Sequence, residues 1–271
     1  MSKRTVICHY HIYKNSGTSF EKLLRRQFGD HHISFDSPIA HFQTNQEQLA
    51  EIVAKNHSVA SLSSHQIHLP LPSTLAFRPI GVVFLRHPLL RLGSIFRFEQ
   101  GAQKAGTEPA SLFDGFDDWI TMLTASDDRR YLLSNEQTNH LSRPYLDWPK
   151  SEWKSGRFIY DIDQAITNLH QVQCLGRTEY FDEDVSHFTE ILTAYDISFR
   201  PEPGVAENTS SPEFALTLEA QLQSMKSAIS SEVWEQLIYL NHQDLELYDY
   251  ASTLIAKRQA EGYRPYLSEN I

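Results

Sequence analysis

A lysine and a cluster of small, hydroxyl-bearing residues near the start of the chain have the chemistry of an anion-binding loop. The cluster consists of Ser16, Gly17, Thr18 and Ser19, and Lys14 precedes it. Hydroxyl groups donate hydrogen bonds to phosphate or sulfate, glycine lets the backbone approach an anion closely, and lysine adds a full positive charge. We therefore expect this loop to hold a phosphate or sulfate group.

The flanking residues predict the strand and the helix that position this loop. Residues 6–8, Val-Ile-Cys, form a short apolar run that is typical of a buried strand. From Gly17 the spacing changes, because apolar residues recur at positions 20, 23, 24 and 28, as on one face of a helix. The loop then lies at a helix N-terminus, where unpaired N–H groups and the positive end of the helix dipole attract anions.

A second strand-to-helix junction carries an arginine and a serine. The apolar run of residues 80–85 predicts a buried strand, and Arg86 follows it directly. Pro88 fits the first turn of a helix, and Ser94 lies further along the same predicted helix. A guanidinium and a hydroxyl suit a phosphate group. The alternative is that Arg86 only starts the helix and pairs with a carboxylate.

Together the two junctions resemble those of sulfotransferases, above all the branch that acts on glycans. The first loop reads His-Ile-Tyr-Lys-Asn-Ser-Gly-Thr-Ser over residues 11–19, where that branch has His-Ile-Pro-Lys-x-x-Gly-Thr-Ser. The second reads Arg-x-Pro-x-x-Arg-x-x-Ser over residues 86–94. A nucleotide P-loop is different, because its lysine follows the second glycine of Gly-x-x-x-x-Gly-Lys-Ser/Thr.

The resemblance implies a donor substrate, 3′-phosphoadenosine 5′-phosphosulfate, and a role for each residue. Arg86 and Ser94 would bind its 3′-phosphate, and Lys14 would stabilise the charge that grows on the leaving phosphate oxygen. The residues that would hold the 5′-phosphate are Ser16, Gly17, Thr18 and Ser19. This chemistry requires no metal. Further likenesses to the family lie at residues 135–138, Asn-x-Gln-Thr, at residues 176–181, Gly-x-Thr-Glu-x-Phe, and at residues 244–248.

The acceptor hydroxyl needs a base, and His65 is the first choice among the 13 histidines. Histidine titrates near neutral pH, and His65 closes a predicted strand at residues 58–63 that we expect beside the first strand. Ser64-His65 also resembles the Gly-His pair that supplies the base in the glycan-type branch. His68 and Glu21 are the reserves, Glu21 because it lies one helical turn past Gly17. His65-x-x-His68 alone is a weak metal signal, because no third ligand is in view.

Composition and charge narrow the class of protein. The chain has 271 residues, of which 41% are hydrophobic and 21% charged, and its net charge is −10. This composition is typical of a globular protein, and the negative net charge argues against a general nucleic-acid binder or a basic membrane-surface protein. A strand begins almost at once and no apolar run approaches the roughly 20 residues of a membrane span, so we expect a soluble, cytoplasmic enzyme. Cys8 and Cys174 fall in predicted strands and are expected to be buried free thiols.

The order of the elements predicts the fold class. We expect one α/β domain over residues 1–271, with a doubly wound, mainly parallel sheet, flanking helices and a helical C-terminal part. Residues 1–100 would carry the donor-binding elements, and residues 101–271 would complete the fold with helices and form the acceptor side. Helices are predicted at residues 46–55, 112–123, 162–170, 214–229 and 233–240, a strand at residues 172–176, and a surface connector at residues 202–212.

The leading hypothesis is a sulfotransferase that moves a sulfuryl group to a hydroxyl or amine of a glycan, a glycolipid or a small molecule. The alternatives are a P-loop kinase-like phosphotransferase that uses ATP and Mg²⁺, and a non-catalytic nucleotide-binding module. Aromatic residues that could stack on an acceptor, although aromatics are more often core, are Tyr10, Tyr13, Trp119, Tyr145, Trp148 and Trp153. The identity of the acceptor and the oligomeric state, a homo-oligomer included, stay open.

Overall fold

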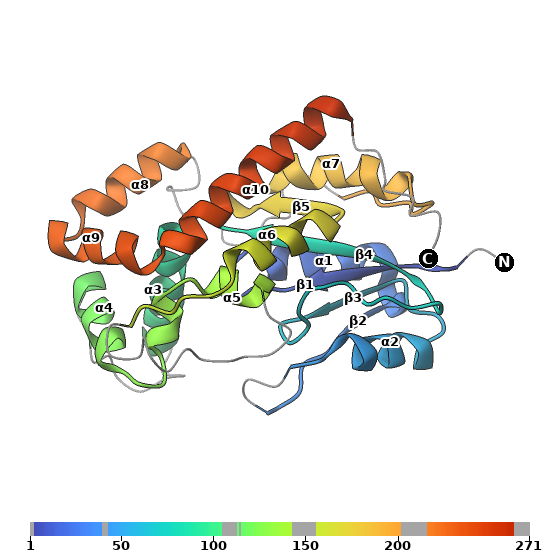
Figure 1. Ribbon diagram of the computed structural model, residues 1–271, viewed down its shortest axis with the longest axis horizontal. Helices are drawn as coiled ribbons and strands as arrows, with labels where there is room; N and C mark the ends of the chain where they lie inside the picture. Colours follow the sequence, from blue (N-terminus) through green and yellow to red (C-terminus); the bar gives the residue numbers. More distant parts are fainter. Residues whose placement is uncertain are drawn as a thin grey trace.

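A parallel sheet of five strands forms the centre of the computed structural model, which describes residues 3–39, 43–104, 113, 115–142, 156–201 and 216–262 (Figure 1). The strands are β1 (Thr5–Tyr10), β2 (His32–Ser34), β3 (Ser61–Ser64), β4 (Arg78–Leu85) and β5 (Cys174–Arg177). Their order across the sheet is β2-β3-β1-β4-β5, and every neighbouring pair is parallel. The predicted α/β fold with a parallel sheet and flanking helices is confirmed. The short strand β2 was not expected.

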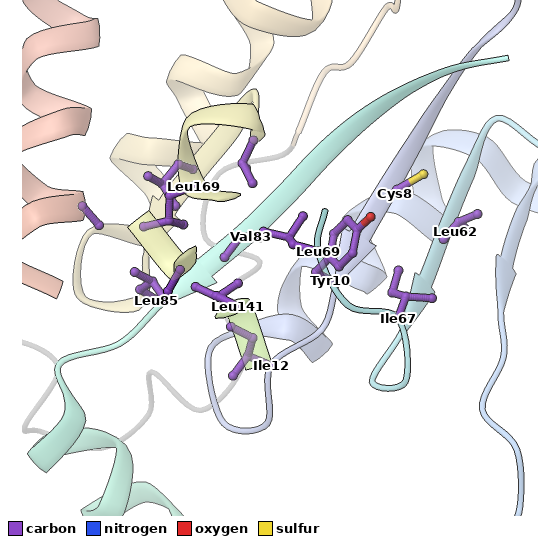
Figure 2. Packing of buried hydrophobic residues seen from close by; sticks show 14 of the residues in the cluster. Cys8, Tyr10, Ile12, Leu62, Ile67, Leu69, Val83, Leu85, Leu141 and Leu169 are labelled. Carbon is purple, nitrogen blue, oxygen red and sulfur yellow. The ribbon is translucent and has the colours of Figure 1, made fainter. Parts of the chain in front are cut away.

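Alternate residues of β1 feed two hydrophobic cores, one on each face of the sheet. Val6, Cys8 and Tyr10 belong to the first core and Ile7 to the second, as the two-residue period of a strand requires. The first core is covered by α2 (Gln46–Lys55), α5 (Glu136–Ser142), α6 (Ile162–Gln171) and α10 (His242–Glu261). Figure 2 shows Tyr10, Leu69 and Val83 gathered in this core.

The opposite face is covered by α1 (Gly17–Phe28) and α7 (Phe181–Thr193). Phe20 of α1 lies against Phe84 of β4 with ring centroids 5.3 Å apart, and Phe188 of α7 lies 5.5 Å from Phe84. Gly176 of β5 sits under these rings, and an added Cβ there would come within 2.7 Å of Phe84. The helices therefore pack closely because the strand offers no side chain at that position.

A third core lies beyond the C-terminal ends of the strands, on the left in Figure 1. It is built by α3 (Pro88–Lys104), α4 (Phe116–Ala125), η2 (Arg130–Leu133), α8 (Leu218–Ser227) and α9 (Ser231–Leu240). Trp119 and Leu237 are fully buried in it. This helical cluster completes the predicted helical part of the fold. No helix within the described ranges combines the length and the apolar character needed to cross a membrane.

Three of the predicted helices lie close to their predicted bounds. The helix predicted at residues 46–55 is α2, and those predicted at residues 162–170 and 233–240 are α6 and α9. The connector at residues 202–212 lies outside the described residues. Cys8 and Cys174 are buried free thiols, as expected. Two short 3₁₀ segments, η1 (Gly29–His31) and η4 (Thr178–Tyr180), join neighbouring elements.

Candidate functional site

Three neighbouring strands end at the same edge of the sheet, and each leads into a segment that carries a predicted site residue. The central strand β1 pairs with β3 on one side and β4 on the other, with Tyr10 level with Ser64 and Val83. His65 follows β3, the loop with Lys14 follows β1, and Arg86 follows β4. The three predicted groups therefore stand in a row at the carboxyl edge of the sheet, which is where open α/β sheets bind ligands.

The loop after β1 is a tight structure that ends at the N-terminus of α1. Lys14 and Ser16 have left-handed backbone angles, with φ of 65° and 60°, which is uncommon for residues other than glycine. Ser16 precedes α1, and its side chain makes no capping hydrogen bond. The hydroxyl of Ser16 therefore does not occupy the first amide N–H groups of α1. These N–H groups are suited to bind an anion.

Gly17 has a packing role in addition to the expected close approach of an anion. A Cβ built on Gly17 would overlap the imidazole ring of His11. Because Gly17 has no side chain, His11 folds back over the first turn of α1. The loop and the first turn are therefore packed against one another.

Lys14 stands between aromatic rings and other cations. Its Nζ lies 4.4 Å from the ring centroid of Phe98, a cation–π contact. Partial burial lowers the pKa of Lys14, and the positive charges of Arg86 and Arg97 lower it further. An anion that binds beside Lys14 would relieve this repulsion, so the electrostatics of the loop favour a negatively charged ligand.

Arg86 is tied to the loop and to a buried carboxylate. Its Nη1 donates to the carbonyl of Lys14 at 3.1 Å, and its Nε lies 3.9 Å from Oε1 of Glu179. Burial raises the pKa of Glu179, which also accepts hydrogen bonds from the amide of His87 and the hydroxyl of Tyr248. The carboxylate pairing weighed in the sequence analysis is thus present, together with a direct link from Arg86 to the loop.

Gln137 joins the two junctions. Its Oε1 accepts from Nδ2 of Asn15 at 2.6 Å and from the amide of Arg86 at 3.0 Å, and its Nε2 donates to the carbonyl of Arg86 at 2.9 Å. Asn15 also donates to the carbonyl of Phe84. Asp244 accepts from the amides of Gln137 and Thr138 and so anchors the start of α5. This connection was found from the sequence only as a family likeness at residues 135–138.

Ser94, the other predicted ligand of the 3′-phosphate, is half-buried on α3. Arg91, one turn earlier, is buried; its Nε donates to the carbonyl of Tyr13 at 3.1 Å, and its guanidinium pairs with Glu136. Burial lowers the pKa of Arg91 to about 10. Arg91 therefore fixes the start of α3 against the loop, and Ser94 lies one turn further along this helix.

His65 is held by Asp36 and His11. Its Nδ1 lies 2.8 Å from Oδ2 of Asp36, and its amide donates to Oδ1 of Asp36 at 2.9 Å. Its ring stacks on His11 with the centroids 3.8 Å apart. Although partial burial alone would raise the pKa of Asp36, hydrogen bonds from His65 and Ser64 lower it overall. Sequence reasoning missed Asp36, whose only signal was its place in a polar segment after the first helix.

The two reserve bases have different surroundings. His68 is 8% exposed, its Nδ1 donates to the carbonyl of His140 at 3.2 Å, and burial lowers its pKa to about 4. Glu21 accepts from Nε of Arg25 at 2.9 Å and from the hydroxyl of Ser34. Burial raises the pKa of Glu21, but these hydrogen bonds lower it overall. The side chain of His65 is more exposed than either, at 44%, and is therefore the most accessible of the three to an acceptor.

Of the aromatic residues considered for acceptor binding, Tyr10 and Trp119 are buried core residues, and Tyr13 is partly buried beside Lys14. Tyr145, Trp148 and Trp153 lie outside the described residues. In the part of the chain that the structure describes, no group of three or more His, Cys, Asp or Glu side chains is arranged to hold a metal ion.

Comparison with known proteins gives two matches that extend over most of the chain. Residues 1–251 match the pattern of the Sulfotransferase family. The chain is also 22% identical over 253 residues to a protein of Archaeoglobus fulgidus described as an uncharacterized protein, and the match covers 91% of this chain and 95% of that protein.

Proposed function

Because the chain belongs to the sulfotransferase family, we propose that it transfers a sulfuryl group from 3′-phosphoadenosine 5′-phosphosulfate to a hydroxyl or amine of an acceptor. The acceptor class we propose is a glycan, a glycolipid or a small molecule, and the compartment is the cytoplasm. The observation that carries the proposal is the row of His65, Lys14 and Arg86 after the adjacent parallel strands β3, β1 and β4.

The row supports a division of labour across the donor. The 5′-phosphosulfate would lie on the loop residues Ser16, Gly17, Thr18 and Ser19 at the N-terminus of α1. The 3′-phosphate would lie toward β4, with Arg86 and Ser94. The hydrogen bond from Arg86 to the carbonyl of Lys14 supports this assignment, because it holds the two anion sites at a fixed separation.

The transfer step follows from these positions. The acceptor oxygen forms a bond to sulfur, and the bond between sulfur and the bridging phosphate oxygen breaks, leaving its electron pair on that oxygen. Lys14 neutralises the charge that develops there. His65, at the other end of the row from Arg86, takes the proton of the acceptor hydroxyl at Nε2. We propose that no metal takes part.

We further propose that residues 1–271 act as one domain, with the donor elements in residues 1–100 and the acceptor side in residues 101–271. Helices α4, α8 and α9 support this division, because they lie beyond the C-terminal ends of the strands, where the site residues stand (Figure 1).

Calorimetric titration with adenosine 3′,5′-bisphosphate tests the donor class, with ATP and Mg²⁺ titrated in parallel, each with and without a chelator. We expect micromolar binding of the bisphosphate that the chelator does not change. Arg86→Ala should weaken this binding, whereas Arg78→Ala, an exposed arginine at the other end of β4, should not. Binding of ATP with Mg²⁺ alone would favour the kinase-like alternative. Tight bisphosphate binding without transfer to any acceptor would favour a non-catalytic module.

A further inference from the structure

The carboxylate beside His65 has the geometry of a group that orients a catalytic imidazole. We propose that Asp36 is a positioning residue, which holds His65 with its proton on Nδ1 and its Nε2 directed to the acceptor. The inference rests on the proposed role of His65 as the base. Asp36 was not among the residues that the sequence pointed to.

Both oxygens of Asp36 bind His65, and one of them also binds Ser64. Oδ2 lies 2.8 Å from Nδ1 of His65, while Oδ1 accepts from the amide of His65 at 2.9 Å and from the hydroxyl of Ser64 at 2.7 Å. Because the backbone and the ring of His65 bind the same carboxylate, the side chain cannot rotate without losing a hydrogen bond. An ionised carboxylate only accepts, so in the neutral ring the proton lies on Nδ1 and the lone pair on Nε2.

The stacking partner of His65 limits the remaining freedom of the ring. His11 lies 3.8 Å away between ring centroids, with an interplanar angle of 27°. Burial, followed by the neighbouring His65, lowers the pKa of His11 to about 4. His11 is therefore neutral at physiological pH and acts as a flat packing surface. Nδ1 of His11 also lies 3.8 Å from Oε2 of Glu21.

The role of Asp36 during transfer follows from charge. When the acceptor oxygen attacks sulfur, its proton moves to Nε2 of His65, and the ring becomes an imidazolium that carries protons on both nitrogens. Asp36 stays ionised and keeps the Nδ1 proton in its hydrogen bond, so its negative charge stabilises the imidazolium. The electron pair of the broken sulfur–oxygen bond remains on the phosphate oxygen beside Lys14.

Asp36→Asn tests this inference while keeping the size of the side chain. The amide of His65 and the hydroxyl of Ser64 both donate to the Oδ1 position, so the new amide oxygen stays there and its NH₂ faces the ring. An NH₂ group donates to Nδ1, which moves the imidazole proton to Nε2 and removes the lone pair needed for proton transfer. The matched control is Asp30→Asn, an exposed aspartate of η1.

The first readout is the tautomer of His65 by ¹⁵N NMR, with its signals identified by their loss in His65→Ala. We expect the Nδ1–H form in the wild type and in Asp30→Asn, and the Nε2–H form in Asp36→Asn. The second readout is the rate of sulfuryl transfer from the donor to the best acceptor in a panel of sugar and phenol hydroxyls. We expect Asp36→Asn to lose roughly 100-fold or more, while its affinity for adenosine 3′,5′-bisphosphate stays at the wild-type value.

The outcomes separate this inference from the proposed function. If His65→Ala abolishes transfer but Asp36→Asn keeps the wild-type rate, the role of Asp36 is refuted and His65 stands as the base. An unchanged tautomer in Asp36→Asn would refute it as well. If His65→Ala transfers at the normal rate, the choice of base is wrong, whatever the tautomer of His65.

Discussion

The side-chain amide of Gln137 connects both anion-binding junctions, so its removal should affect stability and donor binding together. The substitution we consider is Gln137→Met, which keeps the length of the side chain and removes its polar atoms. Methionine fills irregular buried space well, so steric effects should be small. The loss of hydrogen bonds then dominates the outcome.

The magnitude follows from the groups that lose their partner. The amide and the carbonyl of Arg86 both bond to Gln137, while Nδ2 of Asn15 keeps its bond to the carbonyl of Phe84. A buried backbone group without a partner costs about 1–3 kcal/mol, so two such groups should lower the free energy of unfolding by roughly 2–6 kcal/mol. This is a large share of the about 5–15 kcal/mol that stabilises a typical protein.

Urea unfolding followed by tryptophan fluorescence measures the first effect, and calorimetric titration with adenosine 3′,5′-bisphosphate measures the second. Because the backbone of Arg86 would lose its link through Gln137 to Asn15 of the loop, we expect the affinity for the bisphosphate to fall by about tenfold or more, a difference of about 1.4 kcal/mol. The control is Gln223→Met, which changes an exposed glutamine of α8. It should alter neither quantity.

Two results would refute this reasoning in different ways. A loss of stability below about 1 kcal/mol would mean that the groups of Arg86 find other partners, and the connection would not be structural. A large loss of stability with wild-type bisphosphate affinity would mean that Gln137 supports the fold but does not position Arg86 for the donor.

Three further predictions concern single residues of the site. Lys14→Ala should reduce the transfer rate by roughly 100-fold or more while it changes bisphosphate affinity far less, and equal losses would contradict its role at the leaving oxygen. Gly17→Ala should lower the free energy of unfolding by about 1–3 kcal/mol, because the new Cβ would overlap the His11 ring. Adding the second change His11→Ala should restore stability. Wild-type stability of the single variant would show that the ring can move freely. Burial lowers the pKa of His68 from 6.5 to about 4, so between these values the unfolded chain binds a proton that the folded protein excludes, and stability falls as the pH drops. Between pH 7 and pH 4 the free energy of unfolding of His68→Asn, measured with urea, should therefore fall by roughly 3 kcal/mol less than that of the wild type. If the two free energies fall in parallel with pH, this role of His68 is excluded.

The parts of the site that the sequence predicted are those encoded by neighbouring residues. The change from an apolar run to a helical stripe around Gly17, and the apolar run before Arg86, are local patterns that determine where a strand stops and a helix starts. Both junctions are found where these patterns place them. The strand before His65 was found for the same reason.

The parts that were missed leave no periodic or local pattern in the sequence. Gln137 is 51 residues from Arg86 and 122 from Asn15, and no local pattern indicates such a contact. The packing of His11 over Gly17 depends on the backbone of one loop, where Lys14 and Ser16 adopt left-handed angles without being glycine. The strand β2 has three residues, too few for a periodic signal.

The pairing of β2 with β3 explains how Asp36 reaches His65. In this parallel pair His32 is level with Ser61 and Ser34 with Ser63, and Nδ1 of His32 bonds to the hydroxyl of Ser61 at 2.8 Å. His32 and Ser61 are 29 residues apart, and so are Asp36 and His65. The same register, continued past the ends of both strands, places the carboxylate opposite the imidazole. A register shifted by one residue would turn side chains to the other face of the sheet, so the shortest strand of the sheet is the element that aligns the proposed base.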